Sequence, residues 1–125
     1  MVCLLNLQNR SYKKNGIYTV KQVNSYIKNM FTQDFMLNRI YVKGEISNCK
    51  YHPSGHIYFS LKDESGTIAC VMFAGSRAGL SFTLKNGQRV IAFGSVSVYE
   101  RDGKYQLYAR EIKLDGAGEL YEKFE

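Results

Sequence analysis

Cysteine is scarce in this 125-residue sequence and shows no pairing pattern. Its three cysteines, Cys3, Cys49 and Cys70, are an odd number without the spacing of a disulfide framework. Because disulfides persist mainly in oxidising compartments, we expect a reduced, intracellular protein. No apolar run approaches the length of a membrane span, so we expect no membrane segment. Residues 1–17 are too short and too polar for a signal peptide and are interpreted as a flexible tail.

Residue patterns that would indicate an active site are also missing. The sequence has no glycine-rich phosphate-binding loop, no nucleophile placed with a base and no clustered carboxylates for a two-metal nuclease centre. Cys49, His52 and His56 have a C-x2-H-x3-H spacing, but a structural zinc site needs a fourth ligand. Only a carboxylate or the distant Cys70, which we expect in the core, can supply it. We therefore predict no metal, no cofactor and no catalytic residue in this part of the chain.

Basic and aromatic residues are what the sequence does contain. Seventeen Lys and Arg against eleven Asp and Glu give a net charge of +6, and 14% of the residues are aromatic. Nucleic acid combines negative charge with flat bases, so this composition favours a nucleic-acid partner. A basic surface that only keeps the protein in solution is the alternative. The length predicts one domain.

The first predicted element is a helix over residues 18–35. Thr19 can cap its N-terminus, and Gln22, three residues later, completes a capping box. Apolar residues then recur at helical spacing and give the helix one apolar face. They are Val20, Val23, Ile27, Met30 and Phe31. We expect this face to pack on the body of the domain.

From residue 37 the apolar period changes to two, which is typical of β-strands. Gly44 and Gly94 interrupt two of the strands and are interpreted as bends. Asp102–Gly103 predicts a tight hairpin. Five strands are expected, at about 37–50, 56–62, 67–74, 89–100 and 104–114, with a short helix or turn near 76–82 and every neighbouring pair antiparallel.

This order of elements predicts an all-β fold with flanking helices. The body is expected to be a five-stranded Greek-key OB-fold barrel over residues 36–115, preceded by the N-terminal helix. An SH3-like barrel is the main alternative, but its strands are usually shorter. A helix of two turns is marginal alone, so residues 116–125 are expected to begin a helix that leads to domains outside this sequence.

The ligand surface of an OB fold includes its second and third strands. In the second strand, alternation places Tyr58 and Lys62 outside, and Val71 and Phe73 of the third strand fall on the same side. Tyr58 and Phe73 can stack on bases, while Lys62 and Lys43 reach phosphates. Arg39, Tyr41 and Tyr51 can extend the surface. The alternative is ordinary cross-strand packing of the aromatics, with Phe73 beneath the helix.

The hairpin between the last two strands is a second candidate contact. Loops of this position also bind ligands in OB folds. Its basic and aromatic residues are Tyr99, Arg101, Lys104, Tyr105 and Tyr108. A charged hairpin tip is more often simply solvated, so this signal is the weaker of the two.

Three segments resemble the N-terminal domain of the exodeoxyribonuclease VII large subunit over residues 18–125. They are YTVKQVNSYIKNMF, YVKGEISNCKYHPSGHIYFSLKDESGTIACVMF and GSVSVYERDGKYQLYAREIKLDGAGELYEKFE. The resemblance implies a bacterial, cytoplasmic enzyme that degrades single-stranded DNA to oligonucleotides. It also implies a catalytic domain and a contact with the small subunit, both further toward the C-terminus. The DNA-holding face would carry over to Lys43, Tyr58, Lys62, Val71 and Phe73.

Two other functions stay open. The second and third strands are also similar to the anticodon-binding barrels of class II aminoacyl-tRNA synthetases, and fold does not decide between DNA and RNA. The domain can instead be a structural or protein-interaction module that uses its exposed aromatics to dock.

Overall fold

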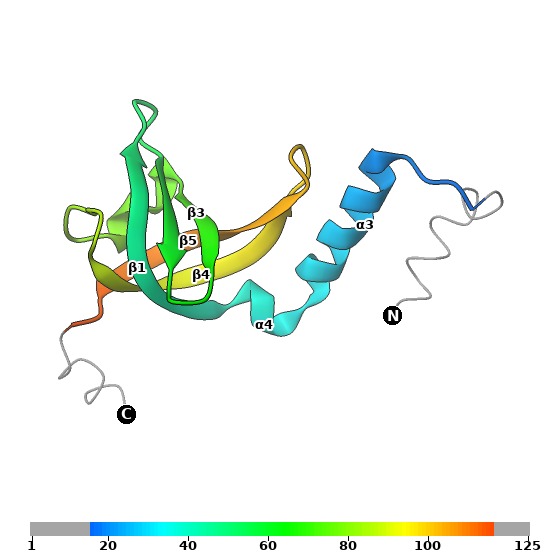
Figure 1. Cartoon of the computed structure of the whole chain (residues 1–125). Coiled ribbons are helices and arrows are strands. Elements are labelled where there is room, and N and C mark those ends of the chain that lie inside the picture. Colours follow the sequence, from blue (N-terminus) through cyan, green and yellow to red (C-terminus); the bar gives the residue numbers. More distant parts are fainter. Residues whose placement is uncertain (1–15, 117–125) are drawn as a thin grey trace.

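The structure of the protein, a computed structural model, describes residues 16–116. In this range a helix and a short helical turn lead into a closed five-stranded barrel (Figure 1). The elements are α3 (Val20–Gln33), α4 (Phe35–Asn38), β1 (Ile40–Tyr51), β2 (Ile57–Lys62), β3 (Thr67–Met72), η1 (Ala74–Gly79), β4 (Arg89–Tyr99) and β5 (Lys104–Leu114). The predicted tail, 1–17, and the predicted helical segment, 116–125, lie almost entirely outside the described residues. Within them, neither helix has the length and apolarity to cross a membrane.

The strand order around the barrel is β1-β2-β3-β5-β4, which closes back onto β1. This confirms the predicted barrel. The expectation that every neighbouring pair is antiparallel is wrong, because β3 and β5 run parallel, with Val71 opposite Tyr108. The reason is geometric. Strand directions cannot alternate all the way around a closed ring with an odd number of strands, so at least one pair must be parallel.

The barrel interior is filled by one face of each strand. On β2, Ile57, Phe59 and Leu61 are buried, and on β3 so are Cys70 and Met72, as the alternation predicted. Burial of such side chains is the main favourable term in folding, at about 1.5–3 kcal/mol for each large apolar residue. The core is completed by Ile46, Leu84, Val90, Ala92, Val96, Leu107, Ala109 and Ile112.

Local irregularities adjust the strands. Gly44 lies where β1 changes partner from β4 to β2, and a Cβ there would be 3.0 Å from the carbonyl oxygen of Lys62. The register of β1 against β2 shifts around Asn48, which has a φ of 51°. The register of β4 against β5 shifts at Gly94 and leaves Arg110 as an extra residue on β5. Such bulges bend a strand and redirect side chains.

Helix α3 begins with the predicted capping box. The backbone N–H of Gln22 donates to Thr19 Oγ1 at 3.1 Å, and the Thr19 N–H donates to Gln22 Oε1 at 2.7 Å. The expected packing of its apolar face on the barrel is wrong. Only Phe31 packs against the core, whereas four apolar residues remain exposed, namely Val20, Val23, Ile27 and Met30. Asn24 and Lys28, on the same side of the helix as Phe31, make further contacts with the barrel through Glu100.

Candidate nucleic-acid interface

The outer face of β2 and β3 is open, as predicted. Tyr58 and Phe73 are 43% and 45% exposed. Helix α3 lies beside the β4–β5 hairpin and not over this face (Figure 1). Val71 sits between Tyr58 and Tyr108 in the strand register, but it is only 2% exposed. Its predicted contact with a ligand therefore fails, because neighbouring side chains cover it. We interpret Val71 as the support beneath the exposed rings.

Five rings gather on this face and form what we call the aromatic cluster. Phe73 stacks on Tyr108, with ring centroids 5.7 Å apart and planes at 28°. His56 meets Phe73 edge to face at 5.2 Å and Tyr58 at 6.4 Å. His52 meets Tyr58 at 6.0 Å. The cluster thus extends from the loop that joins β1 to β2 across to β5, on the kind of surface where OB folds hold ligands.

Sequence reasoning missed part of this cluster. The sequence predicts Tyr108 at the β4–β5 hairpin, but the parallel pairing of β3 with β5 brings it beside Phe73 instead. The odd number of strands signals that one pair is parallel, but it does not give the register that places Tyr108. Alternation places His56 on the outer face with Tyr58, but the sequence suggests a role for His52 and His56 only as metal ligands and not as rings of this cluster. Among residues 16–116 no three His, Cys, Asp or Glu side chains form a group that can hold a metal ion.

The loop at 52–56 is fixed by its own hydrogen bonds. His56 Nδ1 accepts the Ala74 N–H at 2.9 Å, and His52 Nδ1 accepts the Ser54 N–H at 3.1 Å. Arg77 of η1 donates to the carbonyl of Gly55 at 3.0 Å. Both histidines therefore carry their proton on Nε2 when neutral. These bonds hold the two imidazole rings of the aromatic cluster before any ligand arrives.

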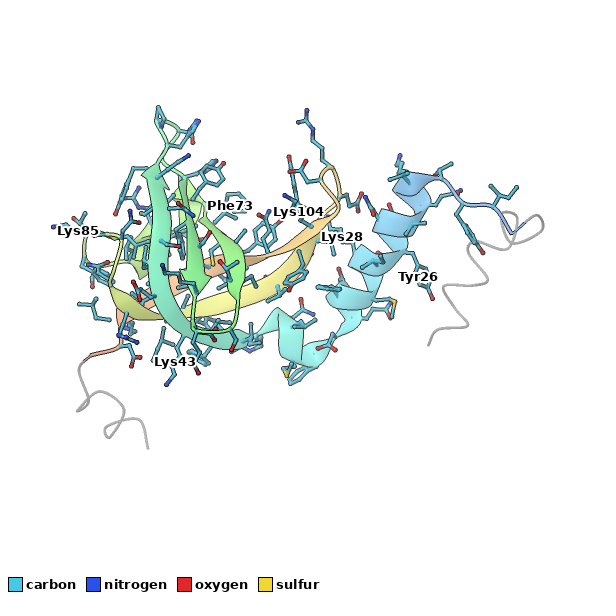
Figure 2. The ribbon with its side chains drawn as sticks, viewed as in Figure 1. Tyr26, Lys28, Lys43, Phe73, Lys85 and Lys104 are labelled. Atoms are coloured by element: carbon cyan, nitrogen blue, oxygen red, sulfur yellow. The ribbon has the colours of Figure 1, made fainter. Side chains whose placement is uncertain are left out.

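The predicted phosphate-binding lysines lie away from the aromatic cluster. Lys43 lies at the lower end of the barrel in Figure 2, whereas Phe73 lies in its upper part. Lys43 and Lys62 line one open cleft of about 520 Å³ with Arg89. Four carboxylates share that cleft, from Glu45, Asp63, Glu64 and Asp115. Hydrogen bonds from the N–H groups of Ser65 and Gly66 lower the pKa of Asp63, which keeps its charge negative. A phosphate in this cleft would therefore be attracted by its basic side chains and repelled by its carboxylates.

The β4–β5 hairpin is held by α3. Asn24 Nδ2 donates to the carbonyl of Glu100 at 2.9 Å, and Lys28 Nζ lies 3.9 Å from Glu100 Oε2. Tyr105 is exposed and its ring centroid is 6.3 Å from that of Phe31. The other predicted hairpin residues, Arg101 and Lys104, are exposed to solvent, and Figure 2 shows Lys104 at the hairpin. Tyr99 is exposed opposite Lys104. The positive φ of Gly103, 67°, confirms the predicted Asp-Gly turn.

Comparison with known families decides the class of this barrel. Residues 18–113 match the model of the OB-fold nucleic acid binding domain. The chain belongs to that family. It is homologous to the N-terminal quarter of the exodeoxyribonuclease 7 large subunit. The protein of that name from Lachnoclostridium phytofermentans is 72% identical over 109 residues, which are 87% of this chain and 27% of that protein. The one from Clostridium botulinum strain Okra is 57% identical over 107 residues, 86% of this chain and 27% of that protein.

Solved structures share the fold of this OB domain at low sequence identity. A replication protein A heterotrimer bound to single-stranded DNA aligns with a TM-score of 0.53 at 11% identity, over 70% of this chain and 67% of that one. The S. pombe Stn1–Ten1 complex aligns with a TM-score of 0.55 at 18% identity, over 71% and 66%. An asparaginyl-tRNA synthetase from Pyrococcus horikoshii aligns with a TM-score of 0.52 at 14% identity, over 72% and 21%. These likenesses establish the barrel and leave the ligand open.

Proposed function

We propose that this OB domain holds single-stranded DNA for a bacterial exodeoxyribonuclease VII large subunit. The observation that carries the proposal is the aromatic cluster, because five adjacent rings on an open face suit unstacked bases. Tyr58 and Phe73 stack on bases, and Lys62 contacts a phosphate. At the hairpin, Arg101 and Lys104 contact the backbone, and Tyr105 offers a further ring.

The parent enzyme would hydrolyse single-stranded DNA to oligonucleotides in the cytoplasm, together with its small subunit. Catalysis and assembly would belong to regions outside this sequence. The homology to large subunits of exodeoxyribonuclease 7 supports this assignment. In this proposal the OB domain contributes DNA binding. Removing it from the parent enzyme should therefore lower the apparent affinity for DNA without changing the chemistry of cleavage.

Fluorescence anisotropy with a labelled oligothymidylate tests the aromatic cluster. Loss of one stacking ring costs about 1–3 kcal/mol, so Tyr58→Ala is expected to weaken binding about 5- to 150-fold. Tyr18→Ala is the matched control, since Tyr18 is 44% exposed and precedes α3. Lys62→Ala should also reduce the slope of log affinity against log salt by about 0.7. Wild-type affinity in both Tyr58→Ala and Phe73→Ala would refute the assignment.

Two further measurements separate the alternative functions. Competition with an RNA loop of the same length tests for anticodon-like recognition, which would appear as a preference for RNA through its base edges or 2′-hydroxyls. Light scattering that shows a stable dimer, combined with no oligonucleotide binding, would indicate a protein-interaction module.

A further inference from the structure

A second group of aromatic and cationic side chains lies on the outer face formed by β1, β4 and β5. Tyr41 of β1 pairs with Phe93 of β4, and their ring centroids are 4.7 Å apart. Arg39 and Arg110 place their guanidinium carbons 5.4 Å and 5.0 Å from the centroid of Phe93. We call these four residues the Phe93 surface. The expectation that Arg39 and Tyr41 extend the face of Tyr58 is not met, because Tyr41 pairs with β4 and not with β2, and Arg39 lies over Phe93 of β4.

The bulge on β5 builds this surface. Because Arg110 is the extra residue at the register shift, it and Glu111 are both exposed. The Arg110 guanidinium is then fixed by donating from Nη2 to the carbonyl of Asn38 at 3.1 Å. A guanidinium that is already oriented loses less rotamer freedom when it binds an anion. The bulge therefore places an oriented cation over the half-buried ring of Phe93.

The charges around the Phe93 surface are mostly positive. Neither guanidinium forms an ion pair with another residue in the range 16–116. Lys43 and Lys113 flank the surface in the next row of the sheet, both opposite Ile91. One carboxylate, Glu111, lies opposite Phe93. Tyr41 is 71% exposed, although burial of a tyrosine ring is normally favourable. The exposed Tyr41 ring contacts the half-buried Phe93 ring, and Phe93 carries two guanidiniums that form no ion pair within the described residues, which suits a base and its neighbouring phosphates.

We propose that the Phe93 surface is a second contact for the same single strand, and this rests on the proposed function above. Tyr41 stacks on a base, while Arg39 and Arg110 bind the phosphates on either side. Strand β1 links the two contacts, since Lys50 neighbours Tyr58 and Tyr41 lies nine residues earlier on the same strand. At a rise of about 3.3 Å per residue, the path along β1 between them is roughly 30 Å. A DNA strand long enough to occupy both contacts falls within the 4–16 nucleotides that one OB fold typically binds.

Oligonucleotide length separates the two contacts experimentally. Oligothymidylates of about 5 and about 20 nucleotides bracket the usual site size. Tyr41→Ala is expected to weaken the long probe about 5- to 100-fold and to leave the short probe unchanged. Tyr58→Ala should weaken both probes. Tyr41→Phe should restore most of the affinity for the long probe, because it keeps the ring.

The salt dependence provides an independent readout. Arg39→Gln should reduce the slope of log affinity against log salt by about 0.7 for the long probe only. Lys85→Gln is the control, since Lys85 projects from the loop at the far side of the barrel in Figure 2. If Tyr41→Ala and Arg39→Gln both bind the long probe like wild type while Tyr58→Ala fails, the Phe93 surface is not a nucleic-acid contact and the proposed function stands. If instead Tyr58→Ala and Phe73→Ala both bind the two probes normally, the aromatic-cluster assignment is wrong.

Discussion

The close approach of β4 and β5 at Gly94 gives a sharp test of how the barrel is packed. A Cβ added at Gly94 would overlap the carbonyl oxygen of Tyr108 and would lie 2.9 Å from its carbonyl carbon and 3.0 Å from the Cα of Ala109. All three atoms belong to backbone, so no side chain can rotate away. Gly94→Ala must therefore push the two strands apart by roughly an ångström or more.

Overpacking of this kind typically costs about 1–3 kcal/mol, and we expect the upper end because backbone must move. For a domain of this size, 3 kcal/mol corresponds to a fall in Tm of roughly 10–20 °C. Urea denaturation followed by circular dichroism measures the free energy of unfolding directly. Tyr108 belongs to the aromatic cluster, so the affinity for the oligothymidylate should fall as well.

Gly75→Ala is the matched control, because an added Cβ at Gly75 meets no atom within 4 Å and Gly75 is not among the glycines with positive φ. Its free energy of unfolding should stay within about 0.5 kcal/mol of wild type. Should Gly94→Ala be as stable as Gly75→Ala, the described contact between β4 and β5 is incorrect, and so is the bulge that depends on it.

Two further predictions concern single side chains. Burial raises the pKa of Cys70 to about 12, so between pH 9 and pH 12 the unfolded chain loses the thiol proton while the folded chain keeps it. The free energy of unfolding should therefore fall by up to about 1.4 kcal/mol per pH unit in that window, and urea titrations of wild type and Cys70→Ala should differ in this slope; equal slopes would contradict the burial. Thr19→Ala removes the cap of α3 and should cost about 1 kcal/mol of helix stability, seen as faster amide exchange in the first turn. Gln33→Ala, at the last residue of the same helix, should leave that exchange unchanged, and protection that survives Thr19→Ala would show that the cap is dispensable.

Local sequence signals predicted the strands and the helix start well. Alternation on β2 placed Phe59 inside and Tyr58 outside because a strand period of two leaves no other choice once one face is apolar. The capping box of Thr19 and Gln22 is also predictable from the sequence, because its two partners lie within one helical turn.

Features that depend on distant parts of the chain were harder to predict. The position of Tyr108 beside Phe73 follows from barrel closure, and the orientation of Arg110 follows from a register shift. Neither is encoded by nearby residues. The predicted packing of α3 is wrong because an apolar stripe indicates which face of a helix can be buried but not which partner is available. Here Asn24 and Lys28, through Glu100, determine the side that meets the barrel.

Closure of the strands into a ring also limits how this molecule can associate with others. An open sheet presents unpaired N–H and C=O groups at its edges, where a foreign chain can add as another strand. Each of the five strands described between residues 40 and 114 already has a neighbour on both sides. Recognition by this part of the chain must therefore depend on side chains and loops, so substitutions on the surface can change what it binds while the hydrogen-bonded frame stays intact.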